Sequence, residues 1–200
     1  YINITSGSSV SLSSGEATAD ITFAKNGTGV KLYIAYEYLL SDSTPFTIAP
    51  KIVYVDGTGG SDSNIGIQSA PLKTIQGAIN MLDGLSVSRD IYVAKGNYSE
   101  AITMIEGISI YGGYEAVDWT RDVVANQTEI TDTSSTTSPK AAIYTDNTVT
   151  NATIIDGFYI IGNTSGISTS GIYNAGGSPI IRNNAIDGGD GDSTYGIYEE

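Results

Sequence analysis

The chain has 200 residues, among them 24 glycines, with 9 Lys and Arg against 22 Asp and Glu, and it contains neither cysteine nor histidine. The formal net charge of -13 argues against nucleic acid as a partner, because phosphate contacts need clustered Lys and Arg. It also disfavours anionic membrane surfaces, and no apolar run is long enough to span a bilayer. The missing residue types exclude disulfides, Cys/His zinc sites and triads that contain histidine.

Residues 1–49 alternate apolar and polar side chains, as in Ala17–Phe23 and Val30–Tyr36, which predicts short antiparallel strands. The order of these strands, with a closing Phe46-Thr-Ile48, resembles the last strands of bacterial immunoglobulin-like surface domains. About fifty residues are fewer than such a sandwich needs. Either the first half lies upstream, or these strands pack onto the next domain or complete a neighbouring subunit.

Residues 51–98 combine two strands with one helix. A strand at Lys51–Val55 precedes a polar glycine loop, and a helix is expected over about 71–83, with Pro71 as its first residue. Its apolar residues fall at helical spacing, and Gly84 ends it. A second strand is predicted at 91–94, where the coils described next begin.

Several motifs in order resemble the N-terminal region of β-helix surface proteins of the pectate-lyase-like superfamily: Ile52–Gly57, Ala70–Ile79, Ile91–Tyr98, Ile108–Tyr114, Trp119 and Arg121. The resemblance implies an all-β fold over residues 50–200: a right-handed, single-stranded parallel β-helix. It also implies that the short N-terminal α-helix caps the open end of the first coil. Residues 1–49 then supply antiparallel, β-sandwich-like strands before it.

Internal repeats support a solenoid. Ile105–Gly112 returns as Ile155–Gly162 after fifty residues, and Ile130 lies midway, which predicts coils of about 25 residues. Gly171-Ile-Tyr173 returns as Gly196-Ile-Tyr198, and the Ile154–Gly162 pattern returns at an offset of 26. Since the chain starts at Tyr1 and stops within what looks like another repeat, we expect a processed chain or a piece of a longer protein whose coils continue beyond 200.

Two acidic loops are candidates for calcium. Asp187, Asp190 and Asp192 lie within six residues on a glycine-rich backbone, and Asp56 and Asp62 flank a second glycine loop. Calcium needs several oxygen ligands that converge, which such loops can supply. The alternative is that these residues form solvated turns, because Asp tolerates the backbone angles of turns. Calcium is the only cofactor that the sequence suggests.

The catalytic candidates are Asp118, Asp122 and Arg182. Two carboxylates near Trp119 have the residue types of a glycosidase site, and Arg182 is one of three basic residues within residues 99–200. The alternative is a packed loop, since acids four residues apart fix no geometry. Trp119 and Tyr114 are candidates for contact with a glycan. The alternative is that they reflect the ordinary composition of strands, in which aromatic residues are common.

Six Asn-x-Ser/Thr sequons are candidates for N-glycosylation: Asn3, Asn26, Asn97, Asn126, Asn151 and Asn163.

The sequence therefore predicts an extracellular cell-surface protein that is structural or adhesive and without catalytic activity, with surface glycans or copies of itself as partners. The competing hypothesis is a polysaccharide-active enzyme, a lyase or glycoside hydrolase, on the same scaffold. Fold alone does not decide between them.

Overall fold

A computed structural model describes residues 52–84, 88–133 and 140–200, together with short strands before residue 50. The chain divides into two compact units, residues 1–50 and 51–200. In the first unit, β1 pairs with β2 in parallel, whereas β3 with β6 and β4 with β5 form antiparallel pairs. The bounds are β1 Ile2–Asn3, β2 Ile21–Thr22, β3 Gly27–Val30, β4 Tyr33–Tyr36, β5 Leu39–Asp42 and β6 Phe46–Ile48.

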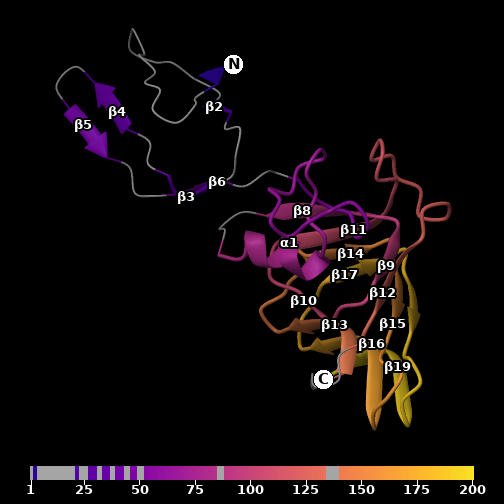
Figure 1. The fold of residues 1–200 in the computed structure, drawn as a ribbon. Coiled ribbons are helices and arrows are strands. Elements are labelled where there is room, and N and C mark those ends of the chain that lie inside the picture. Colours follow the sequence, from indigo (N-terminus) through magenta and orange to yellow (C-terminus); the bar gives the residue numbers. More distant parts are fainter. Residues whose placement is uncertain are drawn as a thin grey trace. The chain divides into compact units, whose positions relative to one another are not determined.

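The second unit consists of three parallel sheets that the chain visits in rotation (Figure 1). Sheet 1 contains β7 Ile52–Val55, β8 Arg89–Ala94, β11 Ile108–Tyr114, β14 Ile154–Asp156 and β17 Ile180–Arg182. Sheet 2 contains β9 Gly96–Tyr98, β12 Thr128–Thr131, β15 Tyr159–Ile161 and β18 Ala185–Asp187. Sheet 3 contains β10 Ile102–Thr103, β13 Lys140–Asp146, β16 Ser168–Ala175 and β19 Ser193–Glu199. From β8 onward every third strand returns to the same sheet, which is the arrangement of a parallel β-helix.

Aliphatic ladders from successive coils build the core. In sheet 1 the register aligns Val53, Ile91, Ile110, Ile155 and Ile181. Sheet 2 aligns Ile130 with Ile160, and sheet 3 aligns Ile143 with Ile172; all four side chains are fully buried. Each fully buried aliphatic side chain contributes roughly 1.5–3 kcal/mol through the hydrophobic effect. These aligned side chains agree with the solenoid that the internal repeats predict.

The coil length is not uniform, and the predicted 25-residue spacing of Ile105, Ile130 and Ile155 is wrong, since Ile130 lies in sheet 2 and aligns with Ile160. Ile155 aligns with Ile110, 45 residues earlier, rather than with Ile105. The Ile105–Gly107 segment is a turn before β11, because Ile108 N donates to Ile105 O at 3.3 Å. The second coil is longer because a loop follows β11, and loops vary in length while strand register stays fixed. The later repeats at offsets of 25 and 26 are confirmed by register.

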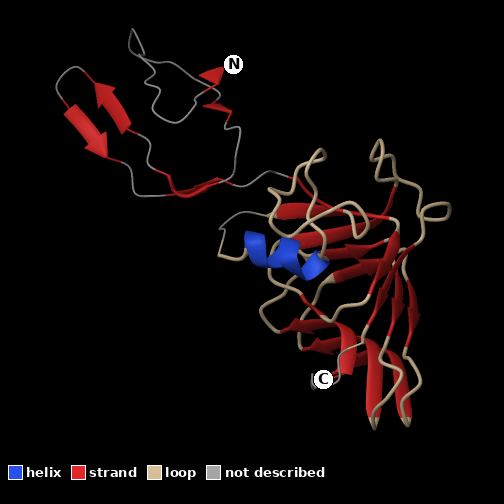
Figure 2. Ribbon diagram, in the orientation of Figure 1, coloured by secondary structure: helices blue, strands red, loops and turns tan. Residues whose placement is uncertain are grey.

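Helix α1 spans Ile75–Leu82 and is the one helix among the described residues (Figure 2). The predicted start near Pro71 is wrong, because Leu72 pairs with Val55: Leu72 N donates to Tyr54 O in β7, and Leu72 O accepts from Asp56 N directly after it. Thr74 is the N-cap instead, and its side chain accepts a hydrogen bond from Gly77 N at 3.0 Å. No helix in the described residues is long and apolar enough to cross a membrane.

Glu100 attaches this helix to the first coil. Its two carboxylate oxygens accept hydrogen bonds from Ile75 N and Gln76 N, each at 2.9 Å. Thr103 N in β10 donates to the side-chain oxygen of Gln76 at 2.8 Å. The carboxylate therefore satisfies two amides that the first turn of a helix leaves without intrahelical partners.

Replacing Glu100 with alanine should lower the free energy of unfolding by about 1–2 kcal/mol, since two partly buried amides lose their acceptor. Glu100→Gln keeps one strong acceptor and should lose less. The exposed Glu199 in β19 provides the control, Glu199→Ala, with an effect within about 0.5 kcal/mol. Urea unfolding followed by circular dichroism measures all three. Equal midpoints for Glu100→Ala and the control would contradict this role.

Candidate functional site

The outward positions of sheet 1 form a continuous row across five strands. The register aligns Tyr54 with Tyr92, Tyr92 with Tyr111, Tyr111 with Asp156, and Asp156 with Arg182. We call these five residues the sheet-1 row. Neighbouring strands are about 4.8 Å apart, so the row extends roughly 19 Å along the coils. Its three tyrosines are half-buried, which leaves part of each ring accessible.

Edge-to-face contacts fix the tyrosine rings of the row. The ring centroids of Tyr54 and Tyr92 are 5.8 Å apart, and those of Tyr92 and Tyr111 are 5.9 Å apart, with nearly perpendicular planes. Trp119 packs edge-on against Tyr54 at 4.7 Å, and Tyr114 stacks on Tyr92 at 4.4 Å. Such aromatic pairs stabilise beyond the area that they bury.

Trp119 and Tyr114, the predicted glycan contacts, lie inside this cluster rather than on its surface. They are only 9% and 7% exposed. Burial raises the pKa of Tyr114, and the neighbouring Tyr92 adds to that shift. The accessible aromatic surface therefore comes from the half-buried tyrosines of the row.

A buried carboxylate lies between two guanidinium groups where the tyrosines end. Asp156 Oδ1 accepts a hydrogen bond from Arg121 Nη2, and Oδ2 accepts one from Arg182 Nε, both at 2.6 Å. Asn183 Nδ2 also donates to Oδ1, at 3.2 Å. Arg121 Nε donates in addition to Gly112 O at 2.8 Å. We call Arg121, Asp156 and Arg182 the Arg–Asp–Arg cluster.

With two guanidinium groups and one carboxylate, the Arg–Asp–Arg cluster carries a net positive charge. Burial by itself would raise the pKa of Asp156, but hydrogen bonds from Arg121, Arg182 and Asn183 lower it below its usual value. The guanidinium carbon of Arg121 lies 5.7 Å from the ring centroids of both Tyr111 and Tyr114, within cation–π range. Arg182 keeps 52% of its side chain exposed and can donate to a ligand.

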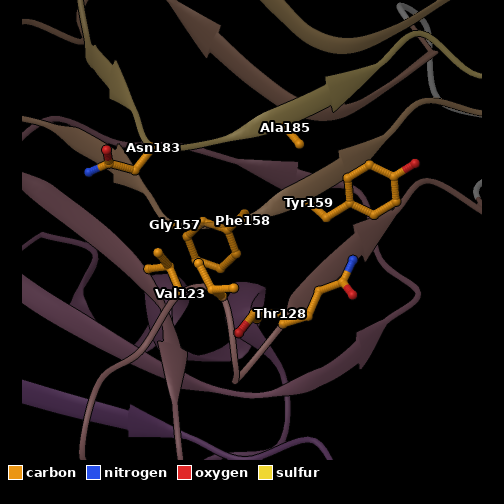
Figure 3. A pocket seen from close by; sticks show the side chains of 9 residues that line it. Val123, Thr128, Gly157, Phe158, Tyr159, Asn183 and Ala185 are labelled. Atoms are coloured by element: carbon orange, nitrogen blue, oxygen red, sulfur yellow. The ribbon is translucent and has the colours of Figure 1, made fainter.

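A small pocket opens at the corner where sheet 1 passes into sheet 2. Its volume is about 180 Å³, and three successive coils contribute to it (Figure 3). We call this cavity the corner pocket. It is lined by Val123, Val124, Gln127, Thr128, Gly157, Phe158, Tyr159, Asn183 and Ala185. Asn183 joins it to the Arg–Asp–Arg cluster through its bond to Asp156.

The predicted catalytic acids Asp118 and Asp122 each stabilise a turn. Asp118 Oδ1 accepts hydrogen bonds from Thr120 N and Oγ1, and Asp122 Oδ1 accepts them from Val124 N and Ala125 N. These bonds lower the pKa of both carboxyl groups. A glycosidase general acid needs a raised pKa. The third candidate, Arg182, is bound to Asp156 rather than to either acid.

The predicted calcium ligands also take part in local hydrogen bonds. Asp56 Oδ1 accepts a bond from Thr58 N, and Asp187 Oδ1 accepts one from Gly189 N, both at 2.9 Å. Asp62 accepts bonds from Lys73 N, Thr74 N and Thr74 Oγ1 beside the start of α1. Asp190 and Asp192 lie in the exposed loop before β19. In the described part of the chain, no three acidic side chains cluster in a way suited to a metal ion.

The sequons differ in accessibility. Asn97 in β9 and Asn151 in a turn are exposed, whereas Asn126 and Asn163 are buried. Asn163 Nδ2 donates to Asp132 Oδ2 at 3.2 Å. Asn3 belongs to β1, and Asn26 lies outside the described residues. Among the described side chains, a glycan can be accommodated on Asn97 and Asn151 without unfolding.

Rotation of the chain through three parallel sheets, with aligned aliphatic ladders, defines the class as a parallel β-helix. A family model described as "Protein of unknown function (DUF1565)" matches residues 58–199, and the chain therefore belongs to the DUF1565 family. No curated protein and no solved structure matches the chain.

Proposed function

We propose that this chain is an extracellular surface protein that adheres to glycans without transforming them, through the sheet-1 row and the corner pocket. The observation that carries the proposal is a row of half-buried tyrosines that ends at the Arg–Asp–Arg cluster, which Asn183 joins to the corner pocket. Binding sites combine aromatic surface with a few fixed polar groups. A row of roughly 19 Å suits an extended ligand rather than one small molecule.

We propose the finer fold assignments on the same basis. The coils of residues 51–200 form a right-handed β-helix of the pectate-lyase-like superfamily, and α1 caps its first coil. Contacts of α1 with β7, β8 and β10 support the cap. The antiparallel pairs β3–β6 and β4–β5 support an immunoglobulin-like end domain in residues 1–49. The surface location rests on the resemblance to surface proteins of these two kinds.

The decisive experiment compares two tyrosine variants from different sheets. Tyr111→Ala should weaken binding to a retained polysaccharide by about fivefold or more, because truncating a central aromatic contact typically costs over 1 kcal/mol. Tyr173→Ala is the matched control, since Tyr173 is half-buried in an outward row of sheet 3, with Tyr144 and Tyr198. Affinity electrophoresis against a panel of neutral and acidic polysaccharides measures both variants after a check of their folding.

Three results bear on the proposal. Selective weakening by Tyr111→Ala supports it, while equal binding by both variants removes the sheet-1 row from the interface. Release of new reducing ends or unsaturated products by the unmodified chain, abolished by Asp118→Ala or Asp187→Ala, would instead establish the enzyme alternative.

A further inference from the structure

The corner pocket is lined by uncharged side chains. None of its nine lining residues is Asp, Glu, Lys or Arg, in a chain with a net charge of -13. A charged sugar substituent would find no countercharge on these walls and would lose hydration on entry. The pocket itself therefore favours an uncharged group, although the Arg–Asp–Arg cluster lies beside it.

The pocket offers apolar contact together with an amide and a hydroxyl group. Val123 and Phe158 lie next to each other in Figure 3, with Ala185 and Tyr159 beyond them. Phe158 is buried, while Val123 is 38% exposed at the mouth. Gln127 contributes an exposed amide side chain, and Tyr159 contributes a phenol.

The other two polar side chains have fixed partners. Thr128 Oγ1 accepts a hydrogen bond from Gly113 N at 2.9 Å, and Asn183 Nδ2 donates to Asp156. Gln127 and Tyr159 are therefore the groups best placed to pair with a ligand. With a volume near 180 Å³, the pocket is smaller than the roughly 300–1,000 Å³ of typical ligand pockets, so it suits a substituent rather than a whole molecule.

Resting on the proposed function, we propose that the corner pocket binds the acetamido group of an N-acetylated sugar while the sheet-1 row holds the rest of the glycan. The acetamido methyl group packs against Val123 and Phe158. Its N–H and C=O pair with the amide of Gln127, which carries both donors and an acceptor. A hydroxyl in the same place would leave the apolar walls uncovered, so the pocket discriminates between the two substituents.

Two neutral probes isolate this group: the β-1,4-linked tetrasaccharides of N-acetylglucosamine and of glucose, which differ in an acetamido or a hydroxyl group at one position of each ring. Since neither is charged, the net charge of the chain does not bias the comparison. Titration calorimetry should give an affinity on the order of tenfold higher for the acetylated probe, comparable with discrimination by small apolar groups elsewhere.

Two variants test whether the preference for the acetylated probe arises in the corner pocket. Ala185→Tyr fills the pocket from an exposed position in β18, and Gln127→Ala removes the amide; each should reduce the preference to about threefold or less. Ala175→Tyr, at the end of β16 in sheet 3, adds the same side chain elsewhere and should leave the preference unchanged. A preference that survives Ala185→Tyr would overturn the assignment of the pocket.

The remaining outcomes separate this inference from the proposed function. Equal binding of both probes, weakened by Tyr111→Ala, overturns the acetamido assignment and leaves glycan adhesion standing. Failure of the chain to bind either probe or any polysaccharide of the panel overturns both.

Discussion

Replacing Asp156 with alanine should lower the free energy of unfolding by about 2–3 kcal/mol, because a buried carboxylate that accepts three side-chain hydrogen bonds, two of them from guanidinium groups, is lost. The Asp156 side chain is only 2% exposed and accepts bonds from Arg121, Arg182 and Asn183. Asp156→Asn keeps hydrogen-bonding groups without the charge and should fall between alanine and the unmodified chain. Urea unfolding at pH 7 gives the three values.

Acid titration adds a second test of this carboxylate. Its pKa in the folded chain is lower than its usual value near 3.9, so its stabilising effect is fully present above that value. The effect is lost as the pH falls through the lowered folded pKa. Asp156→Ala should therefore lose less stability than the unmodified chain on acidification from pH 5 to pH 2.

Arg182→Ala is the control for the Arg–Asp–Arg cluster. The Arg182 side chain is 52% exposed, and its loss leaves Asp156 bonded to Arg121 and Asn183, so the cost should stay below about 1 kcal/mol. If Asp156→Ala lowers the free energy of unfolding by no more than Arg182→Ala does, the carboxylate does not stabilise the Arg–Asp–Arg cluster.

Part of the architecture was predictable from local patterns, because short apolar runs recur along the chain and glycines follow several of the strands, as Gly157, Gly162 and Gly188 do. The resemblance implied a parallel β-helix, and offsets of 25 and 26 identified the last coils, but the division of the strands into three sheets was not predicted. The start of α1 was not predictable from Pro71, because a tertiary contact of Leu72 with β7 overrides the local preference for helix.

The candidate site was harder to predict because its members are distant in sequence. Arg121 and Asp156 are 35 residues apart, and they meet because Arg121 lies in the loop after β11 while Asp156 ends the neighbouring strand β14. The catalytic prediction rested on Asp118 and Asp122 because they are close in sequence. In the structure each of them accepts hydrogen bonds from its own turn. The sequence did contain one signal for this site, the pair Asp156-Gly157. A glycine directly after an acid at a strand end leaves room for another side chain, here Arg121, to approach the carboxylate.

Gly157, which follows Asp156, has no room for a Cβ atom. Gly157 has a φ of +86°, and a Cβ there would lie 2.5 Å from Arg121 Nη2 and 2.8 Å from Val123 Cγ1. Arg121 cannot simply move aside, because its displacement breaks the bond to Asp156. Gly157→Ala should therefore destabilise the chain by about 3 kcal/mol, from backbone strain together with lost contacts.

Gly84 provides a matched control because it shares the backbone angle without the crowding. Its φ is +78°, and a Cβ there would meet nothing within 4 Å, so Gly84→Ala should cost only the strain of about 1 kcal/mol. Urea unfolding of both variants separates steric displacement from strain. Combining Gly157→Ala with Asp156→Ala should cost less than the sum of the two, since both remove the same contact. Strict additivity would mean that Gly157 acts only through its own backbone and does not position Arg121.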